Sequence, residues 1–173
     1  MQIGVFADVH DHVDHMRHAV REFNAAGCEL VLLAGDLCSP LVVPPLRKLH
    51  GQLVVCFGDN DGNKTGIRGG MRICGTIGEP PLGIETRDGI RILLTHQLDR
   101  LKGLVDGADV IVFAHTHRPS IATDAQGRLF VNPGETSGWN FRKPSIAVID
   151  SETRQARLVH LPPMPEPVAI ESF

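Results

Sequence analysis

Short apolar runs alternate with one clear helical pattern along the first third of the chain. Apolar residues fill 2–7, 29–34 and 52–57, and polar or glycine residues bound each run, which predicts buried strands. Residues 12–26 carry apolar side chains at helical spacing and stop before Gly27, which predicts a helix. Strands that alternate with helices are typical of an α/β domain.

The rest of the chain predicts a second set of strands. Residues 82–87 and 90–95 flank Asp88-Gly89 and predict a hairpin with a tight turn. Short helices are predicted over 44–50 and 97–105. Further strands are predicted over 109–114, 128–131, 145–149 and 155–161. We expect two sheets that pack face to face with helices outside.

Length and charge limit the class of protein. The chain has 173 residues, enough for one domain over 1–161, and the proline-rich stretch 162–173 predicts an exposed tail. A net charge of -3 argues against strong nucleic-acid binding. The apolar runs are too short to span a membrane. Because Met1 leads directly into a strand and leaves no room for a signal peptide, we expect a cytoplasmic protein.

Carboxylate and imidazole residues stand where the predicted strands end. These residues are Asp8, His10, Asp36, Asp59, His96, His115 and His117. Loops that leave one edge of a sheet converge on one crevice, so these side chains can meet. Mixed Asp and His ligands suit manganese, iron, nickel or zinc better than calcium. Seven ligands are too many for one ion and fit two ions that share a carboxylate, an arrangement that activates water to attack a phosphate ester.

The ordered clusters resemble the calcineurin-like metallophosphoesterases, and most closely their small single-domain prokaryotic phosphodiesterase branch. Residues 8–12, 58–61 and 132–134 carry the resemblance, as Asp-Val-His-Asp-His, Gly-Asp-Asn-Asp and Asn-Pro-Gly. The resemblance implies a four-layer αββα sandwich with two mixed sheets. It also implies one metal held by Asp8, His10, Asp36 and His117, and another held by Asp36, Asp59, His96 and His115. We expect two divalent ions, with manganese preferred over nickel, iron or zinc.

The chain departs from the family pattern in three respects. Asp59 stands where the family has a ligand Asn, and it adds a negative charge while still able to bind metal. Asn60 stands where many relatives have a His that can protonate the leaving group, and an amide cannot do so. Ala114 and Gln97 replace a Gly and a His of the usual motifs. The second departure favours diesters with good leaving groups.

The predicted function is a metal-dependent phosphodiesterase that acts through a metal-bridging hydroxide on a small phosphodiester or nucleotide-like substrate. His115, His117 and Asp59 are the predicted catalytic residues, and Asn60, His12 and Arg118 are candidate substrate contacts. One alternative is a phosphomonoesterase or nucleotidase of the same superfamily. Another is a non-catalytic protein-binding scaffold of the same fold. The retromer scaffold subunit is similar to such a protein, because it looks like this fold used as a protein-binding platform. A homodimer is possible in each case.

Overall fold

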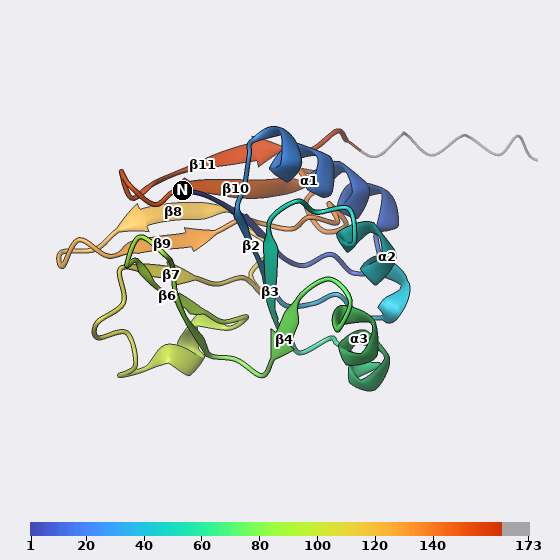
Figure 1. Ribbon diagram of the computed structural model, residues 1–173, viewed down its shortest axis with the longest axis horizontal. Coiled ribbons are helices and arrows are strands. Elements are labelled where there is room, and N and C mark those ends of the chain that lie inside the picture. Colours follow the sequence, from blue (N-terminus) through green and yellow to red (C-terminus); the bar gives the residue numbers. More distant parts are fainter. Residues whose placement is uncertain (164–173) are drawn as a thin grey trace, which may run out of the picture.

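Two mixed β-sheets lie face to face in the computed structural model, which describes residues 1–163 (Figure 1). The first sheet has the strand order β11-β10-β1-β2-β3-β4. Its strands are β1 (Gln2–Phe6), β2 (Leu30–Ala34), β3 (Gln52–Cys56), β4 (Thr76–Gly78), β10 (Ser145–Asp150) and β11 (Gln155–His160). Strands β1 to β4 run parallel, and β10 pairs antiparallel with both β1 and β11.

The second sheet has the strand order β5-β6-β7-β9-β8. Its strands are β5 (Leu82–Glu85), β6 (Arg91–Leu94), β7 (Val110–Val112), β8 (Ser120–Thr123) and β9 (Leu129–Asn132). The three inner strands run parallel, and the edge strands β5 and β8 pair antiparallel with their neighbours. Parallel strands of both sheets therefore present their carboxyl ends, and the loops that follow them, toward shared crevices.

Three helices cover the outer face of the first sheet, at the right of Figure 1. They are α1 (Val13–Ala25), α2 (Val43–Leu46), which follows the 3-10 turn η1 (Pro40–Val42), and α3 (Lys64–Met71). Met16 and Phe23 of α1 and Ile67 of α3 are fully buried in this layer. The second sheet is covered by the 3-10 helix η2 (Leu98–Leu101) and its flanking loop, where Leu101 packs under the sheet.

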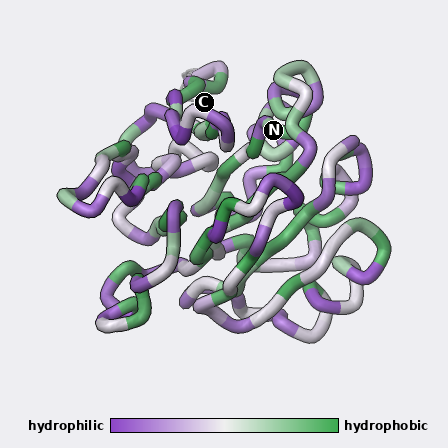
Figure 2. The backbone as a smooth tube through the Cα atoms, turned by 60° about the vertical axis from the view of Figure 1, so that its left-hand side comes forward, coloured by the Kyte–Doolittle hydropathy of each residue, from purple (hydrophilic) through white to green (hydrophobic). Residues whose placement is uncertain are grey.

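Alternate residues of the central strands enter two different hydrophobic cores. Leu32 of β2 faces the core between the sheets, and Val31 and Leu33 face the helices. Because both faces are covered, the strand is apolar throughout, as buried parallel strands are. Figure 2 shows these hydrophobic stretches in green along the strands, with hydrophilic residues concentrated in the loops.

The sandwich matches the predicted four layers, and every predicted strand is present with ends within two residues of the prediction. The predicted helix over 97–105 is the shorter 3-10 segment η2, so the fourth layer is thin. The hairpin loop spans 86–90, so it is longer than the predicted two-residue turn at Asp88-Gly89. Gly89 lies in this loop with φ +82°. Helix α3 and the strands β4 and β8 were not predicted.

Two sequence-based expectations concern the ends of the structure. Most of the predicted exposed tail, residues 164–173, lies outside the described residues. Within residues 1–163, none of the helices has the length and hydropathy needed to cross a lipid bilayer.

Candidate metal centre

The seven predicted ligands follow the carboxyl ends of five strands. Asp8 and His10 follow β1, Asp36 follows β2, Asp59 follows β3, His96 follows β6, and His115 and His117 follow β7. Their ligand atoms form three groups in which all atoms lie within 4.8 Å of one another. The groups are Asp8-His10-His117, Asp59-His96-His115 and Asp8-Asp36-His96. The first two groups correspond to the two expected half-sites, and the third lies between them.

Asp36 is the carboxylate that joins the two half-sites. Its Oδ2 lies 3.6 Å from His10 Nε2 and 3.4 Å from His96 Nε2, so one buried oxygen faces imidazoles of both groups. Asp59 Oδ1 lies 2.8 Å from His96 Nε2 and 3.2 Å from His115 Nδ1. Asp59 rather than Asn60 thus occupies the position of the expected ligand in the second group.

Five of the seven residues have a left-handed backbone. They are Asp8, His10, Asp36, His115 and His117, with φ between 44° and 71°. Non-glycine residues pay for this conformation, and they keep it only where surrounding contacts impose it. Here the Asp8 amide donates to Gly35 O at 3.2 Å, and the His10 amide donates to Asp36 O at 3.0 Å. The loops after β1 and β2 therefore hold each other in the shape that aims the ligands inward.

Two glycines let these loops approach each other. A Cβ at Gly58 would overlap the Asp36 carboxylate, and a Cβ at Gly35 would lie 2.7 Å from His96 Nδ1. Asp61 completes the junction, since its carboxylate accepts hydrogen bonds from the Gly58 amide at 2.7 Å and from the Cys38 amide at 2.8 Å. This acid therefore has a structural role beside the ligands.

Buried polar atoms of the centre fit a metal site. Both carboxylate oxygens of Asp8, Nε2 of His10 and Nε2 of His96 are buried without a hydrogen-bond partner among the described residues. The contacts of His96 Nε2 with Asp36 and Asp59 lie outside hydrogen-bonding geometry. Such groups are costly unless a partner satisfies them, and divalent ions bound by oxygen and nitrogen donors would do so.

The ionisation of the centre is strongly perturbed. Burial raises the pKa of Asp8 to about 7 and lowers the pKa of His10. Burial alone would favour neutral Asp36, but the neighbouring His96 imidazole and the hydrogen bonds from Asn60 hold its pKa far below the usual range. Burial likewise opposes the charged form of His96, yet Asp36 outweighs it and raises the His96 pKa to about 9. Bound cations would replace the protons of Asp8 and His96.

The domain model of the calcineurin-like phosphoesterase superfamily matches residues 1–154. The chain belongs to this superfamily. A phosphodiesterase of Methanocaldococcus jannaschii is 27% identical over 170 residues, covering 93% of this chain and 99% of the relative. A protein of Methanothermobacter thermautotrophicus named a probable metallophosphoesterase is 33% identical over 173 residues, covering 92% of each.

Solved structures agree with this membership. An archaeal phosphodiesterase superposes with a TM-score of 0.86 at 27% identity and covers 93% of this chain and 100% of its own. A phosphoesterase from E. coli has a TM-score of 0.68 at 18% identity, covers 92% of this chain and 98% of its own, and shows the fold alone. The predicted family and αββα fold are confirmed, and the protein is a metal-dependent phosphoesterase.

Contacts behind the ligands fix the histidine rings of this phosphoesterase. His96 Nδ1 lies 2.7 Å from Ala34 O, and His117 Nδ1 lies 2.9 Å from Glu135 Oε2. Partners of this kind set the tautomer and the orientation of metal-binding histidines. The sequence predicts a structural turn over 132–135 and does not single out Glu135, which is 1% exposed. Its only sequence signal is a carboxylate directly after Asn-Pro-Gly.

The three predicted substrate contacts have different surroundings. The side-chain Nδ2 of Asn60 donates to Asp36 Oδ2 at 2.8 Å, and the backbone amide of Asn60 donates to Asp36 Oδ1 at 2.9 Å. His12 caps α1 and stacks on His15, with ring centroids 3.9 Å apart. Arg118 lies over the Phe141 ring, with Cζ 5.0 Å from the centroid. Asn60 therefore supports a ligand, and Arg118 remains exposed beside the centre.

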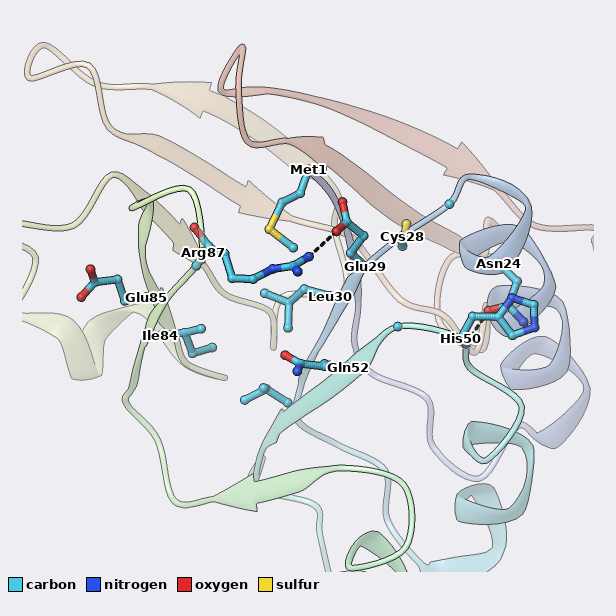
Figure 3. Close-up of a pocket in the computed structure, with 14 residues that line it drawn as sticks. Met1, Asn24, Cys28, Glu29, Leu30, His50, Gln52, Ile84, Glu85 and Arg87 are labelled. Atoms are coloured by element: carbon cyan, nitrogen blue, oxygen red, sulfur yellow. Dashed lines mark hydrogen bonds and ion pairs between the residues drawn. The ribbon is translucent and has the colours of Figure 1, made fainter.

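A small cavity of about 150 Å³ opens beside the second ligand group. Asp59 and His96 line it, together with Lys64 and Arg100, which the sequence analysis did not select. A larger cavity of about 490 Å³ lies where β2 and β3 begin, away from the ligands (Figure 3). Arg87 and Glu29 pair there at 2.5 Å, and none of the three ligand groups lies in it. The larger cavity is therefore separate from the candidate metal centre.

Proposed function

We propose that the protein hydrolyses small phosphodiesters at a centre that holds two divalent metal ions. The observation that carries the proposal is the position of Asp36, whose Oδ2 faces imidazoles of both ligand groups. In this proposal Asp8, His10, Asp36 and His117 hold one ion. Asp36, Asp59, His96 and His115 hold the other. When bound, two such ions polarise phosphoryl oxygens and lower the pKa of a water molecule between them.

The protein's own groups position the ester around that centre. His115 is exposed and touches Asp59, so its ring can also donate to an oxygen of the ester. Arg100 brings positive charge to the adjoining cavity, where an anionic phosphoryl group gains from it. Lys64 lines the same cavity, but its Nζ pairs with Glu79 Oε2 at 3.0 Å. Burial of Asp8 and Asp36 excludes water from the rear of the site, which strengthens these electrostatic contacts.

Two residues support a diester rather than a monoester as substrate. Asp59 adds a negative charge that opposes a dianionic monoester more than a monoanionic diester. Asn60 offers an amide where a general acid would assist a poor leaving group, and its side chain is bonded to Asp36. A monoesterase remains the competing function, and it predicts the opposite preference.

We also propose manganese as the preferred ion, since mixed carboxylate and imidazole donors suit it. The cytoplasm is the proposed location. A homodimer is the proposed assembly, which sedimentation analysis tests directly.

The test is hydrolysis of bis-p-nitrophenyl phosphate by metal-stripped protein before and after addition of manganese. We expect activity only after metal addition, and slower hydrolysis of p-nitrophenyl phosphate under the same conditions. The Asp36→Asn variant serves as a control and should be inactive in both states. Faster monoester hydrolysis would favour the monoesterase, and silence with manganese, nickel and zinc would favour the scaffold.

A further inference from the structure

Two large aromatic side chains are exposed beside the metal centre. Trp139 is 50% exposed and Phe141 is 41% exposed, whereas Phe6, Phe23 and Phe57 are fully buried. Arg118, one residue after His117, lies over the Phe141 ring. We call Trp139, Phe141 and Arg118 the aromatic rim.

Trp139 is tied to the first ligand group. Its Nε1 donates to the backbone oxygen of His10 at 3.3 Å, so the indole lies directly beside a ligand residue. Its ring also lies 4.8 Å from the His12 ring at an interplanar angle of 42°. An indole held at two points yet half exposed offers a rigid flat surface at low entropic cost.

The backbone under the rim is equally fixed. The Phe141 amide donates to Glu135 Oε1 at 2.6 Å, and the Asn140 amide donates to Glu135 Oε2 at 2.9 Å. The same Oε2 accepts from His117 Nδ1 at 2.9 Å. The buried Glu135 carboxylate therefore fixes the position of the aromatic rim relative to His117. A group bound on the rim keeps a constant distance from the reacting centre.

We propose that the aromatic rim is the subsite for a flat aromatic or heterocyclic substituent of the phosphoester, such as a nucleobase. Stacking on aromatic faces tolerates different bases, and the Arg118 guanidinium adds a cation beside the same surface. The substrate class is then a phosphodiester with a base or aryl group on one side. This inference rests on the proposed function, since the rim serves the ester that the centre cleaves.

The composition allows a direct optical test. Trp139 is the only Trp, and the chain has no Tyr, so the intrinsic emission of the protein comes from the rim. Adenosine 5′-monophosphate should quench this emission saturably in the manganese-loaded protein, and ribose 5-phosphate should not. Calorimetry should show that the nucleotide binds about tenfold more tightly than the sugar phosphate, and that Trp139→Leu removes this difference. Equal binding of the two ligands, or a difference that persists in the variant, would overturn the proposal.

Hydrolysis separates this inference from the proposed function. Thymidine 5′-(p-nitrophenyl phosphate) and methyl p-nitrophenyl phosphate share a leaving group and differ in the group that would occupy the rim. Trp139→Leu should raise KM about tenfold for the first ester only, and Trp139→Phe should restore it. Leu104→Ala, at another exposed apolar residue, is the matched control and should change neither. Similar effects on both esters would contradict the rim, whereas failure to hydrolyse either ester would contradict the function and leave the optical test to decide the rim.

Discussion

Glu135 accepts a hydrogen bond from His117 Nδ1 at 2.9 Å, across a separation of 18 residues in the chain. The glutamate is 1% exposed, and its carboxylate also accepts hydrogen bonds from the backbone amides of Asn140 and Phe141. It therefore fixes the ring of a predicted metal ligand, with Nε2 left to face Asp8 at 3.8 Å. A carboxylate behind a metal-binding histidine also increases the basicity of the ring.

Glu135→Gln should weaken manganese binding by about 10-fold to 100-fold, the usual cost of losing such a partner. The glutamine side chain lacks the negative charge of the glutamate. Its NH2 group is a donor, so it cannot accept a hydrogen bond from the Asn140 or Phe141 backbone amide as the carboxylate oxygen in its place does. Isothermal titration of the stripped protein with manganese measures the effect. Glu152→Gln, at an exposed residue of the β10–β11 turn, is the control. Unchanged affinity in Glu135→Gln would show that the contact does not position His117.

Asp59→Asn should shift substrate preference toward monoesters. Removal of one negative charge favours a dianion over a monoanion, by about 1 kcal/mol or roughly fivefold at this partly exposed position. The ratio of bis-p-nitrophenyl phosphate to p-nitrophenyl phosphate hydrolysis should fall accordingly. Asp106→Asn removes the same charge at a fully exposed position outside the cavities that Asp59 and His115 line, and it should leave the ratio unchanged. A constant ratio in Asp59→Asn would argue against the charge as its cause.

Gly58→Ala should displace Asp36 and reduce activity about 100-fold, because misplacement of a reacting group by about 1 Å costs this much. The added Cβ overlaps the Asp36 carboxylate. Gly69→Ala is the matched control, since a Cβ there meets nothing within 4 Å among the described residues. In helix α3 that change should stabilise the fold by about 0.5–1 kcal/mol. Thermal unfolding and manganese titration of both variants check the pair, and full metal binding in Gly58→Ala would be inconsistent with this geometry.

The stability of the fold should depend on pH through the Asp88 carboxylate. Ser151 and Thr86 hydroxyls donate to its carboxylate and lower its pKa to about 2. The folded pKa lies below the unfolded value of about 3.9. The stability that ionised Asp88 contributes is therefore complete above about pH 3.9 and is lost as the pH falls through about 2. Asp88→Asn should therefore lower Tm at neutral pH, and the difference should shrink near pH 2. Asp106→Asn, at a fully exposed carboxylate, is the control. A difference in Tm that is the same at every pH would refute this role.

The sequence singled out the candidate ligands because each stands at a visible strand end. Asp8, Asp36 and His96 follow apolar runs whose period and length indicate buried strands. Helix α3 was missed because Gly66, Gly69 and Gly70 lower its intrinsic propensity. The fold supplies the helix by burying Ile67 and Met71 and by capping it with Asn63.

Features that depend on distant contacts could not be predicted. The left-handed backbone at Asp8 and His10 comes from hydrogen bonds to the loop after β2, which no local pattern encodes. Glu135 looks like a turn residue until folding brings His117 and the 140–141 amides to its carboxylate. Strand β8 is exposed at every residue and has no apolar run to reveal it.

The most direct test of the two-metal account is the number of manganese ions that restore activity. Stripped protein should regain bis-p-nitrophenyl phosphate hydrolysis as manganese is added, with a plateau at two ions per chain. Asp36→Asn should weaken the binding of both ions, because its carboxylate faces both ligand groups. A plateau at one ion, or an Asp36→Asn variant that still binds two ions with full affinity, would contradict the shared-carboxylate centre.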